Sequence, residues 1–489
     1  MGFVFVPVYI SYLGIEAYGL IGLFATLQAW LSLLDLGLSP TLNREMARLR
    51  GGAHTAESIR DLLRSVEIIY SATAIVIAAI VFFSSYWLAS YWLHAEKLPL
   101  ETVATALSIT GLVIAFRWVS GLYRSALGGL QEQVWLNVSN VVFGTLRGAG
   151  VIAVLALVND SINAFFMFQG ALAAVEAVVL SAMVHRALPK GTRHGRFDLT
   201  ALRKIARFAG GISGITFLTL LLTQLDKIVL SGTLALSDFG HYSLAAAVAS
   251  ALYMFVNPVA GAIGPKFAEI FARGRLEELA AAYHRYTQLT AISVLPPAIV
   301  LAMFSNDILS LWTGDVVLAK STAHLVTIMV LGTMLNGLMT VPYFLQLAAG
   351  WTRFTFVTNL VALAFVLPAF LLIVPRVGAI GAASVWLALN IGYVLISVPF
   401  MHRRLLRGEA NSWYLADVLS PLGGILAACT AVRVFVWVIP SSSALISVAA
   451  IVVAAILTEL AGLATTSVGR ELVLNLAQRL SPLFLKRGK

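Results

Sequence analysis

The chain has 489 residues, of which 59% are hydrophobic and only 11% are charged, and its mean hydropathy is +0.89. A soluble domain carries about 25% charged residues, so this composition excludes a water-soluble protein and predicts one that is embedded in a bilayer. The net charge of +10 raises the alternative of nucleic-acid binding, which the placement of the basic residues then decides.

Long apolar runs follow one another along almost the whole chain. A spanning helix needs about 20 apolar residues, because each residue rises about 1.5 Å across a hydrocarbon core of about 30 Å, and this criterion predicts about fourteen spans. Their approximate ranges are 2–13, 18–42, 63–88, 102–127, 133–158, 161–186, 206–231, 238–262, 284–304, 320–347, 353–375, 378–401, 417–439 and 443–465. The runs are apolar on every face, unlike barrel strands. The predicted fold class is therefore an all-α polytopic membrane protein.

The basic residues lie mainly on one side of the predicted spans. They fill the loop 185–207 and recur in the tail 470–489, whereas the opposite side holds only Lys97, Lys320 and Arg376. The positive-inside rule assigns the basic side, and with it both termini, to the cytoplasm. We therefore interpret the net charge as a topology signal that also contacts lipid headgroups, and no nucleic-acid partner is expected.

Two stretches of the chain repeat one pattern. Tyr18-Gly19 aligns with Phe239-Gly240, and each pair begins an apolar helix that is interrupted near its inner end and followed by a basic segment. Parallel repeats are typical of transporters whose substrate path lies between two bundles, each here of about six spans. We predict an N-terminal lobe over 1–190 and a C-terminal lobe over 191–405. Two additional helices and a basic cytoplasmic tail follow over 406–489.

The first apolar run, 2–13, is too short to span and lacks the basic region and cleavage pattern of a signal peptide. Its counterpart in the repeat begins near Phe208, so a first span of equal length would begin before Met1. Either the start codon is assigned late or the first span is short. We favour the late start, because a half-length helix would leave backbone groups unpaired in hydrocarbon.

Three segments carry a family resemblance. They are PVYISYLGIEAYGLIGLF (7–24), LLDLGLSPTLNREMA (33–47) and QLDKIVLSGTLALSDFGHYSLA (224–245). Together they resemble the polysaccharide and O-antigen flippases, the bacterial exporters of lipid-linked oligosaccharides. The shortened first span is the one departure from the family pattern.

The resemblance implies a fold and a function. The expected fold is that of the multidrug/oligosaccharidyl-lipid/polysaccharide exporters, and the expected substrate is a polyprenyl-diphosphate-linked oligosaccharide that alternating access moves to the outer leaflet. The implied location is the bacterial inner membrane. The implied partners are membrane lipids, H+ or Na+ as a coupling ion, and polysaccharide polymerase machinery.

Three arginines lie inside the spans of the N-terminal lobe. A charge at the bilayer centre costs about 2.5–3.5 kcal/mol on insertion scales, so each is expected to face a cavity or a partner. Arg117 and Arg124 share one face of span four, and Arg147 lies midway along span five. Their guanidinium forks suit a diphosphate or an acidic sugar, and we predict that they bind substrate. The alternative is that Arg147 pairs with Glu176 and that Arg124 reaches the inner headgroups.

Span seven carries the adjacent charges Asp226 and Lys227, which point about 100° apart on a helix. At least one is expected to face the cavity, Lys227 as a further substrate-binding cation or Asp226 as the ion-coupling carboxylate. A structural ion pair is the alternative for Asp226. Glu176 is a second, weaker candidate for ion coupling.

Other polar residues within the spans are interpreted as structural. Asp35, near the inner end of span two, is expected to cap or pair with the region 43–44. Arg433 and Glu459, in the two extra spans, are expected to pair with each other. Residues expected to hydrogen-bond between helices are Asn257, Asn336, Gln346, Asn359 and Asn390.

The sequence lacks the signals of an enzyme. It contains neither the phosphate-loop motif G-x-x-x-x-G-K-[ST] nor the metal motif H-E-x-x-H, and its single cysteine, Cys429, offers neither a disulfide nor a cysteine cluster. We expect no catalytic residue, metal or cofactor. A membrane glycosyl polymerase or ligase is disfavoured because the outer loops are short. Extrusion of organic cations by a transporter of the same fold is the main alternative, and it would favour carboxylates over arginines in the lumen.

Overall fold

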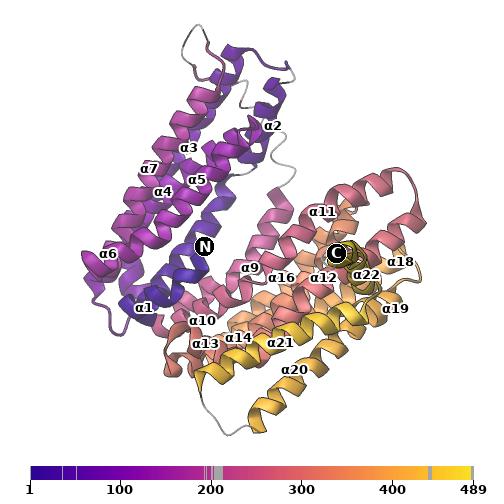
Figure 1. The fold of residues 1–489 in the computed structure, drawn as a ribbon. Coiled ribbons are helices and arrows are strands. Elements are labelled where there is room, and N and C mark those ends of the chain that lie inside the picture. Colours follow the sequence, from indigo (N-terminus) through magenta and orange to yellow (C-terminus); the bar gives the residue numbers. More distant parts are fainter. Residues whose placement is uncertain are drawn as a thin grey trace. The chain divides into compact units, whose positions relative to one another are not determined.

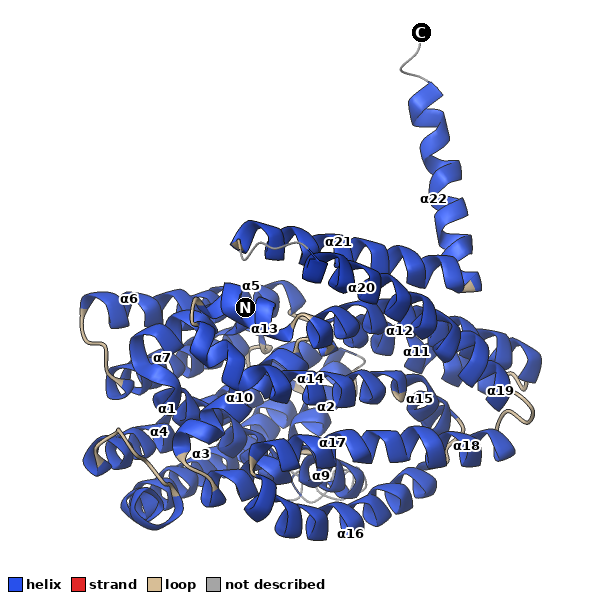
Figure 2. Cartoon of the chain, turned by 90° about the horizontal axis from the view of Figure 1, so that it is seen from below, coloured by secondary structure: helices blue, strands red, loops and turns tan. Residues whose placement is uncertain are grey.

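The computed structural model describes residues 2–35, 37–50, 52–191, 193, 195–199, 202, 213–438 and 443–485. Every regular element among them is a helix (Figure 2). Eleven of these helices are long and apolar enough to cross a membrane, or up to twelve if one bent pair counts as a span. A helix satisfies all its own backbone hydrogen bonds, as the bilayer requires. The expectation of an all-α polytopic membrane protein is confirmed.

The chain divides into two compact units, Met1–Gly240 (unit 1) and His241–Lys489 (unit 2). The helices of unit 1 are α1 (Gly2–Leu31), η1 (Ser32–Asp35), α2 (Leu38–Arg50), α3 (Ala56–Trp87), η2 (Leu88–Trp92), α4 (Leu100–Gly129), α5 (Gln133–Thr145), η3 (Leu146–Gly150), α6 (Val151–Leu157), α7 (Ile162–Ala187) and α9 (Ser213–Thr233). Helix α10 (Leu236–Ser250) contains the boundary between the units. The three-part division of the chain stays a prediction.

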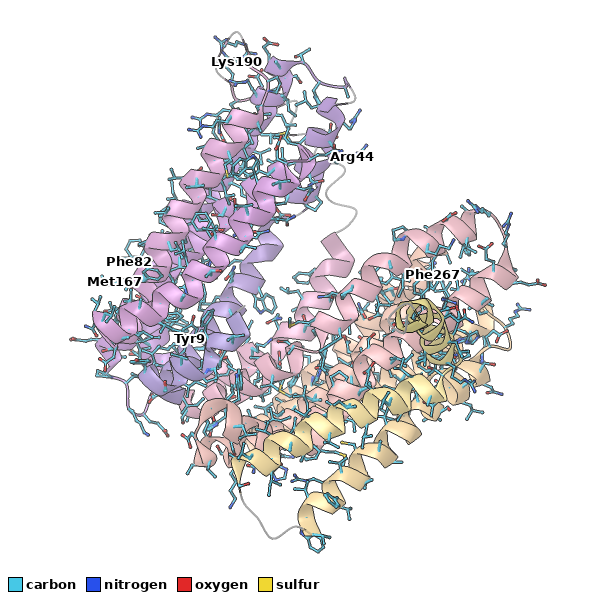
Figure 3. The ribbon with its side chains drawn as sticks, in the orientation of Figure 1. Tyr9, Arg44, Phe82, Met167, Lys190 and Phe267 are labelled. Atoms are coloured by element: carbon cyan, nitrogen blue, oxygen red, sulfur yellow. The ribbon has the colours of Figure 1, made fainter. Side chains whose placement is uncertain are left out.

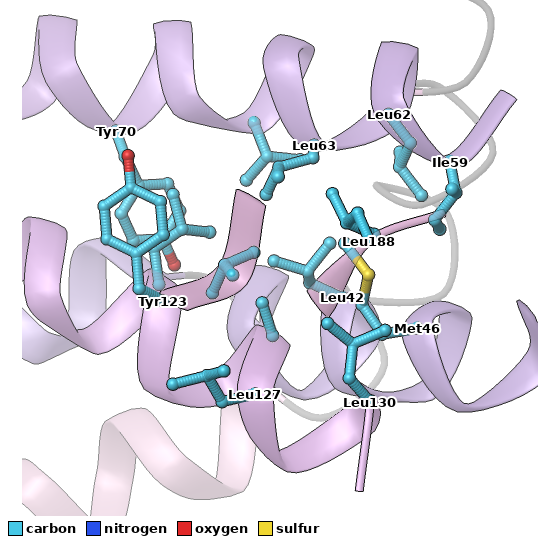
Figure 4. Close-up of a cluster of buried hydrophobic side chains, with 14 of the residues drawn as sticks. Leu42, Met46, Ile59, Leu62, Leu63, Tyr70, Tyr123, Leu127, Leu130 and Leu188 are labelled. Carbon is cyan, nitrogen blue, oxygen red and sulfur yellow. The ribbon is translucent and has the colours of Figure 1, made fainter. Parts of the chain in front are cut away.

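Helix α4 lies at the centre of unit 1, where it packs against α3 and α7 along its length and against α2 and α5 (Figure 1). At one end, a cluster of buried side chains from α2, α3, α4 and α7 closes the bundle, with Leu42 and Met46 of α2 inserted among them (Figure 4). Phe82 of α3 and Met167 of α7 point outward and are 57% and 63% exposed (Figure 3). Such a surface is suited to lipid chains rather than to water.

Two close backbone approaches explain the glycines of the repeated aromatic-glycine pairs. A Cβ added at Gly19 would lie 2.6 Å from the carbonyl oxygen of Leu236, and one added at Gly240 would lie 2.2 Å from that of Ile15. No side chain fits at either position. The two aromatic-glycine pairs that the sequence aligns therefore both lie where α1 meets the start of α10. More than half of unit 1 separates these pairs in the chain.

Unit 2 follows with another series of helices. They are α11 (Tyr253–Ala272), α12 (Leu276–Met303), α13 (Ser305–Thr313), α14 (Val316–Leu338), α15 (Thr340–Ala348), α16 (Thr352–Val377), α17 (Ala379–Gly392), η4 (Tyr393–Ser397), α18 (Val398–Arg404), α19 (Ala410–Ser412), η5 (Trp413–Leu419), α20 (Ser420–Val438), α21 (Ala444–Thr465) and α22 (Ser467–Leu485). Helix α12 is central and packs against α11, α14, α20 and α21. Helix α22 continues from α21 and projects from the rest of the unit (Figure 2).

The interior of unit 2 is held by neutral side chains. Asn336 accepts a hydrogen bond from Tyr253 at 2.8 Å and donates one to Asn390 at 2.9 Å, which links α11, α14 and α17. Tyr393 donates to Asn359 at 3.1 Å. The expected hydrogen bonding between helices is confirmed at these three asparagines.

A polar network joins the C-terminal segment to α12. The imidazole Nδ1 of His284 lies 2.5 Å from Asp417 Oδ2, and its Nε2 lies 3.0 Å from Glu409 Oε2. The amide of Gln288, one turn further along α12, donates to Asp417 Oδ1 at 2.8 Å and accepts from the Ser467 hydroxyl at 2.9 Å. Asp417 is only 1% exposed, so this network fastens the start of α20 and α22 to the body of unit 2.

In the part of the chain that the structure describes, the span count falls below fourteen for identifiable reasons. The predicted span 2–13 and the first part of the predicted span 18–42 form α1, which is interrupted at Gly14 (φ 81, ψ 166) and ends at Leu31. Residues 32–35 and 38–42 of the second predicted span lie in η1 and α2. Residues 206–212 of the predicted seventh span lie outside the described residues. The predicted span 238–262 corresponds to α10 and α11, which meet at a bend of 44°.

One expected ion pair is wrong. Arg433 of α20 donates to Asp307 of α13 at 2.6 Å, and its guanidinium lies 4.9 Å from the centroid of the Phe304 ring. Glu459 of α21 is exposed instead. The sequence alone did not show that α13, a short helix that is not counted among the spans, brings a carboxylate to the end of α20.

Candidate functional site

Two polar contacts join α4 to α7 in the interior of unit 1. Arg117 donates from Nη2 to Gln169 Oε1 at 2.9 Å, and Arg124 forms an ion pair with Glu176. In each helix the two residues are seven positions apart, which is about two turns, or about 10.5 Å along the axis. The side chains therefore meet in register as two successive contacts between the same pair of helices.

A second arginine reaches the same carboxylate. Arg147 lies in η3, a π-helical turn between α5 and α6, and pairs with Glu176. Glu176 is fully buried, while the side chains of Arg124 and Arg147 are 34% and 27% exposed. The structure thus contains the Arg147–Glu176 pair that the sequence raised as an alternative, and it places Arg124 on that carboxylate too. Two guanidinium groups and one carboxylate leave this cluster with one net positive charge.

Arg117 has no carboxylate partner among the described residues. Its Nη1 donates to Gln28 Oε1 of α1 at 2.9 Å, its Nη2 donates to Gln169, and its guanidinium lies 4.9 Å from the centroid of the Phe24 ring. Neutral amides and an aromatic face hold the group in place without neutralising its charge. Unit 1 therefore carries a second uncompensated positive charge about two turns from the first.

Arg117 also lines a polar cavity of about 250 Å³. The residues that line it are Gln28, Leu31, Asp35, Ser39, Tyr70, Ile114, Arg117, Trp118 and Gly121. The rings of Tyr70 and Trp118 are stacked, with centroids 4.9 Å apart and planes inclined by 21°. The cavity therefore combines a cation, a carboxylate and an amide with an aromatic wall, so it can bind an anionic or hydroxyl-rich group.

Asp35 fixes one wall of this cavity. Its carboxylate accepts the backbone N–H of Ser39 in the first turn of α2 at 3.1 Å, and it accepts the hydroxyl of Tyr70. Asp35 therefore caps the start of α2 at Ser39, while its expected contact with the region 43–44 stays a prediction. Asn43 instead donates to the carbonyl of Ser125 at 3.0 Å. A carboxylate that caps a helix while facing a cavity holds both the helix start and the cavity shape.

The two charges of span seven lie on α9. Asp226 is 8% exposed. Lys227 donates from Nζ to Gln224 Oε1 at 2.9 Å and to the Thr223 carbonyl at 3.4 Å, so its hydrogen bonds are made within its own helix. The substrate-binding role of Lys227 and the coupling roles of Asp226 and Glu176 stay predictions.

Sequence reasoning found the arginines of the site but missed their uncharged partners. Gln28, Gln169, Tyr70 and Trp118 complete the surroundings of Arg117. One signal was present in the sequence, because Gln169 precedes Glu176 by the same seven residues that separate Arg117 from Arg124. Within the described residues no group of three His, Cys, Asp or Glu side chains could hold a metal ion.

Comparisons of the sequence with known families match both units. The model of a family described as polysaccharide biosynthesis protein matches residues 1–271, and the MatE family model matches residues 212–372. A protein of Shigella flexneri named "Putative O-antigen transporter" is 19% identical over 378 residues, which cover 76% of this chain and 87% of that protein.

Solved structures share the fold. The lipid II flippase MurJ in an inward closed conformation has a TM-score of 0.70 at 12% identity, covering 94% of this chain and 95% of that chain. An inward-facing multidrug resistance transporter of the MATE family, in the MOP superfamily, has a TM-score of 0.67 at 13% identity, covering 82% and 93% of the two chains. At these identities the likeness establishes the architecture, and the chemistry must be argued from the site.

Proposed function

The chain belongs to the polysaccharide biosynthesis protein family, and on this premise we propose that it flips a polyprenyl-diphosphate-linked oligosaccharide from the inner to the outer leaflet of the bacterial inner membrane. Alternating access carries the headgroup past the candidate site while the lipid tail stays in apolar surroundings. The flippase and transporter folds that this chain shares support a mechanism of this kind.

One observation carries the proposal: the positive charge of Arg117, which no carboxylate among the described residues pairs with, in a polar cavity inside a membrane bundle. A charge in this setting costs about 2.5–3.5 kcal/mol on insertion scales, so its presence indicates a functional partner. A planar guanidinium donates to two oxygens of one phosphate or carboxylate group at once. The net positive charge shared by Arg124 of α4, Arg147 of η3 and Glu176 of α7 lies in the same bundle and favours an anionic cargo.

The size of the cavity limits what binds there. Sites for drug-sized ligands are about 300–1,000 Å³, and this one is about 250 Å³. It therefore holds one sugar ring, an acidic one included, and the rest of the headgroup lies outside it. The stacked Tyr70 and Trp118 rings offer an apolar face to a sugar ring, while Gln28 and Asp35 offer hydrogen bonds to its hydroxyls.

A specific observation favours a second candidate function. The MatE model matches residues 212–372, and a multidrug resistance transporter shares the fold. In that case the cargo is an organic cation, and Asp35, which lines the same cavity, replaces Arg117 as the decisive residue. The two candidates thus predict opposite outcomes for substitutions of Asp35 and Arg117.

Surface glycan in a strain that depends on this protein tests the proposal. Arg117→Ala and Arg147→Ala should each abolish glycan export while the protein remains in the membrane, because each removes a cation from the path of an anionic headgroup. Arg48→Ala is the matched control, since its side chain is 51% exposed and pairs with Glu45 of its own helix. Normal surface glycan in both variants, with resistance to organic cations lost in Asp35→Asn, would establish drug extrusion instead.

A further inference from the structure

A long apolar groove lies between α16 and α17 in unit 2. Its volume is about 770 Å³. Phe354 and Phe400 line one end, and Ile373 and Ser384 line the other. Between them the walls include small residues such as Ala362, which leave the groove open. The groove is separate from the polar cavity of unit 1 and shares no residue with it.

The groove opens on the lipid-facing surface. Helix α16 packs mainly against α15 and α17, and its outward side chains Phe365 and Leu372 are 75% and 61% exposed. A span exposed in this way borders the hydrocarbon of the bilayer. The occupant of the groove is therefore an alkyl or isoprenoid chain rather than a water-soluble ligand.

The length of the groove selects among such chains. From Phe354 to Ile373 the lining of α16 rises about 29 Å at about 1.5 Å per residue, which matches the full hydrocarbon thickness of about 30 Å. A phospholipid acyl chain occupies only one leaflet, so it fills about half of this length. A polyprenyl chain is long enough to follow the groove through both leaflets.

Three exposed arginines surround the end that is predicted to face the cytoplasm. The guanidinium of Arg404 lies 4.5 Å from the centroid of the Trp351 ring, and Trp351 stacks on Phe354 with ring centroids 4.3 Å apart. The guanidinium of Arg403 lies 5.5 Å from the centroid of the Phe400 ring. Arg353 directly precedes Phe354 and is exposed.

The charges at this end complement a phosphate-bearing lipid. In the part of the chain that the structure describes, Arg403 and Arg404 each contact an aromatic ring. No carboxylate in that part of the chain pairs with either of them or with Arg353. Guanidinium groups at the depth of the headgroups donate to phosphate oxygens. Two of these arginines contact the same aromatic rim that ends the apolar groove, so a headgroup bound there has its tail directed into it.

We propose that the groove between α16 and α17 binds the chain of a polyprenyl diphosphate and that Arg353, Arg403 and Arg404 bind its diphosphate. The inference rests on the proposed function, because it assigns to the lipid part of the same substrate a site of its own. The tail then remains bound to unit 2, instead of diffusing freely in the bilayer, and this site recognises the carrier lipid whatever sugar is attached.

Binding of undecaprenyl diphosphate without a sugar to the full-length protein in phosphatidylcholine nanodiscs tests the proposal. Ala362→Trp fills the groove and should weaken binding about tenfold, since excluding about two buried CH₂ groups already lowers the affinity by that factor. Leu371→Trp is the matched control, because Leu371 is 57% exposed on the same helix and does not line the groove.

The charged end is tested in the same assay. The double variant Arg403→Gln, Arg404→Gln should lose about a hundredfold in affinity, because each hydrogen bond to a charged group that is lost costs about tenfold. Arg376→Gln, an exposed arginine at the opposite end of α16, should bind normally. Phosphatidylglycerol should compete only weakly, since its chains reach about half the length of the groove.

The outcomes separate this inference from the proposed function. Equal affinity in Ala362→Trp and Leu371→Trp, or full displacement by phosphatidylglycerol, would overturn the polyprenyl site even if glycan export depends on Arg117. Loss of binding in the groove variants while Arg117→Ala exports glycan normally would retain the lipid site and refute the role of the polar cavity.

Discussion

The two units differ in the kind of polar side chain that they bury between their helices. Unit 1 keeps ions in its interior, where Arg124 and Arg147 share Glu176 and Arg117 is held by neutral partners. Unit 2 connects its spans through neutral amides such as Asn336 and Asn390, and its buried carboxylate Asp417 lies beside His284 at the junction with the C-terminal segment.

This difference suggests distinct roles for the two kinds of polar group: the ions serve substrate binding, and the neutral groups hold helices together. A neutral hydrogen bond between helices contributes about 0.6 kcal/mol to their association, and no ion has to be desolvated to form it. Buried ions are a poor way to gain stability, because desolvation offsets their attraction. Under the proposed function, the ions of unit 1 are explained by an anionic headgroup, whereas the polar groups of unit 2 are explained by packing. Four predictions test this comparison.

The largest loss of stability is expected for Glu176→Gln. Removing the buried carboxylate leaves the partly exposed Arg124 and Arg147 without a counter-charge, and breaking a fully buried pair costs about 3–5 kcal/mol, which is the upper bound here. Thermal unfolding of the detergent-purified protein measures the effect. Glu459→Gln, at an exposed carboxylate of α21, is the control, and an equal shift in both variants would contradict the structural role of Glu176.

A functional loss without a comparable loss of stability is expected for Asp226→Asn. The substitution keeps the size of the side chain and removes its ability to bind a proton or sodium ion. Flipping in vesicles under an imposed proton or sodium gradient should lose its dependence on that gradient. If the dependence is unchanged, Asp226 has a structural role only, and the coupling carboxylate lies elsewhere.

A smaller loss of stability is expected in unit 2 for Asn390→Ala. It removes the acceptor for Asn336 and a hydrogen bond of its own to the Trp386 carbonyl, and hydrogen bonds between spans contribute about 0.6 kcal/mol on average and about 1.7 at most. The same unfolding measurement compares it with Glu176→Gln. A loss of stability as large as that of Glu176→Gln would contradict the proposed difference between the units.

The smallest effect is expected for Arg433→Gln. Its pair with Asp307 is partly open to solvent, with side chains 40% and 25% exposed, and such pairs contribute at most about 1 kcal/mol. Unfolding temperature and surface glycan should both stay close to those of the unaltered protein. Loss of export in this variant would show instead that a charge needed for function lies in the C-terminal segment.

Much of the fold was predictable because the bilayer imposes strong rules on a sequence. Long apolar runs must be helices, so the fold class followed from hydropathy alone. The number of spans was less certain, because hydropathy does not distinguish two helices from one that is interrupted at Gly14, nor a straight span from the bent pair α10 and α11.

In the candidate site, too, the sequence predicted some features and left others to the tertiary structure. The sequence by itself identified Arg117, Arg124, Arg147 and Glu176, because a charge within an apolar run is conspicuous and costly. Only the tertiary structure decided which of them pair. The packing of α4 on α7 places Arg124 on Glu176 and Arg117 on the uncharged Gln169. Partner choice depends on which helix faces which, and hydropathy carries no information about that.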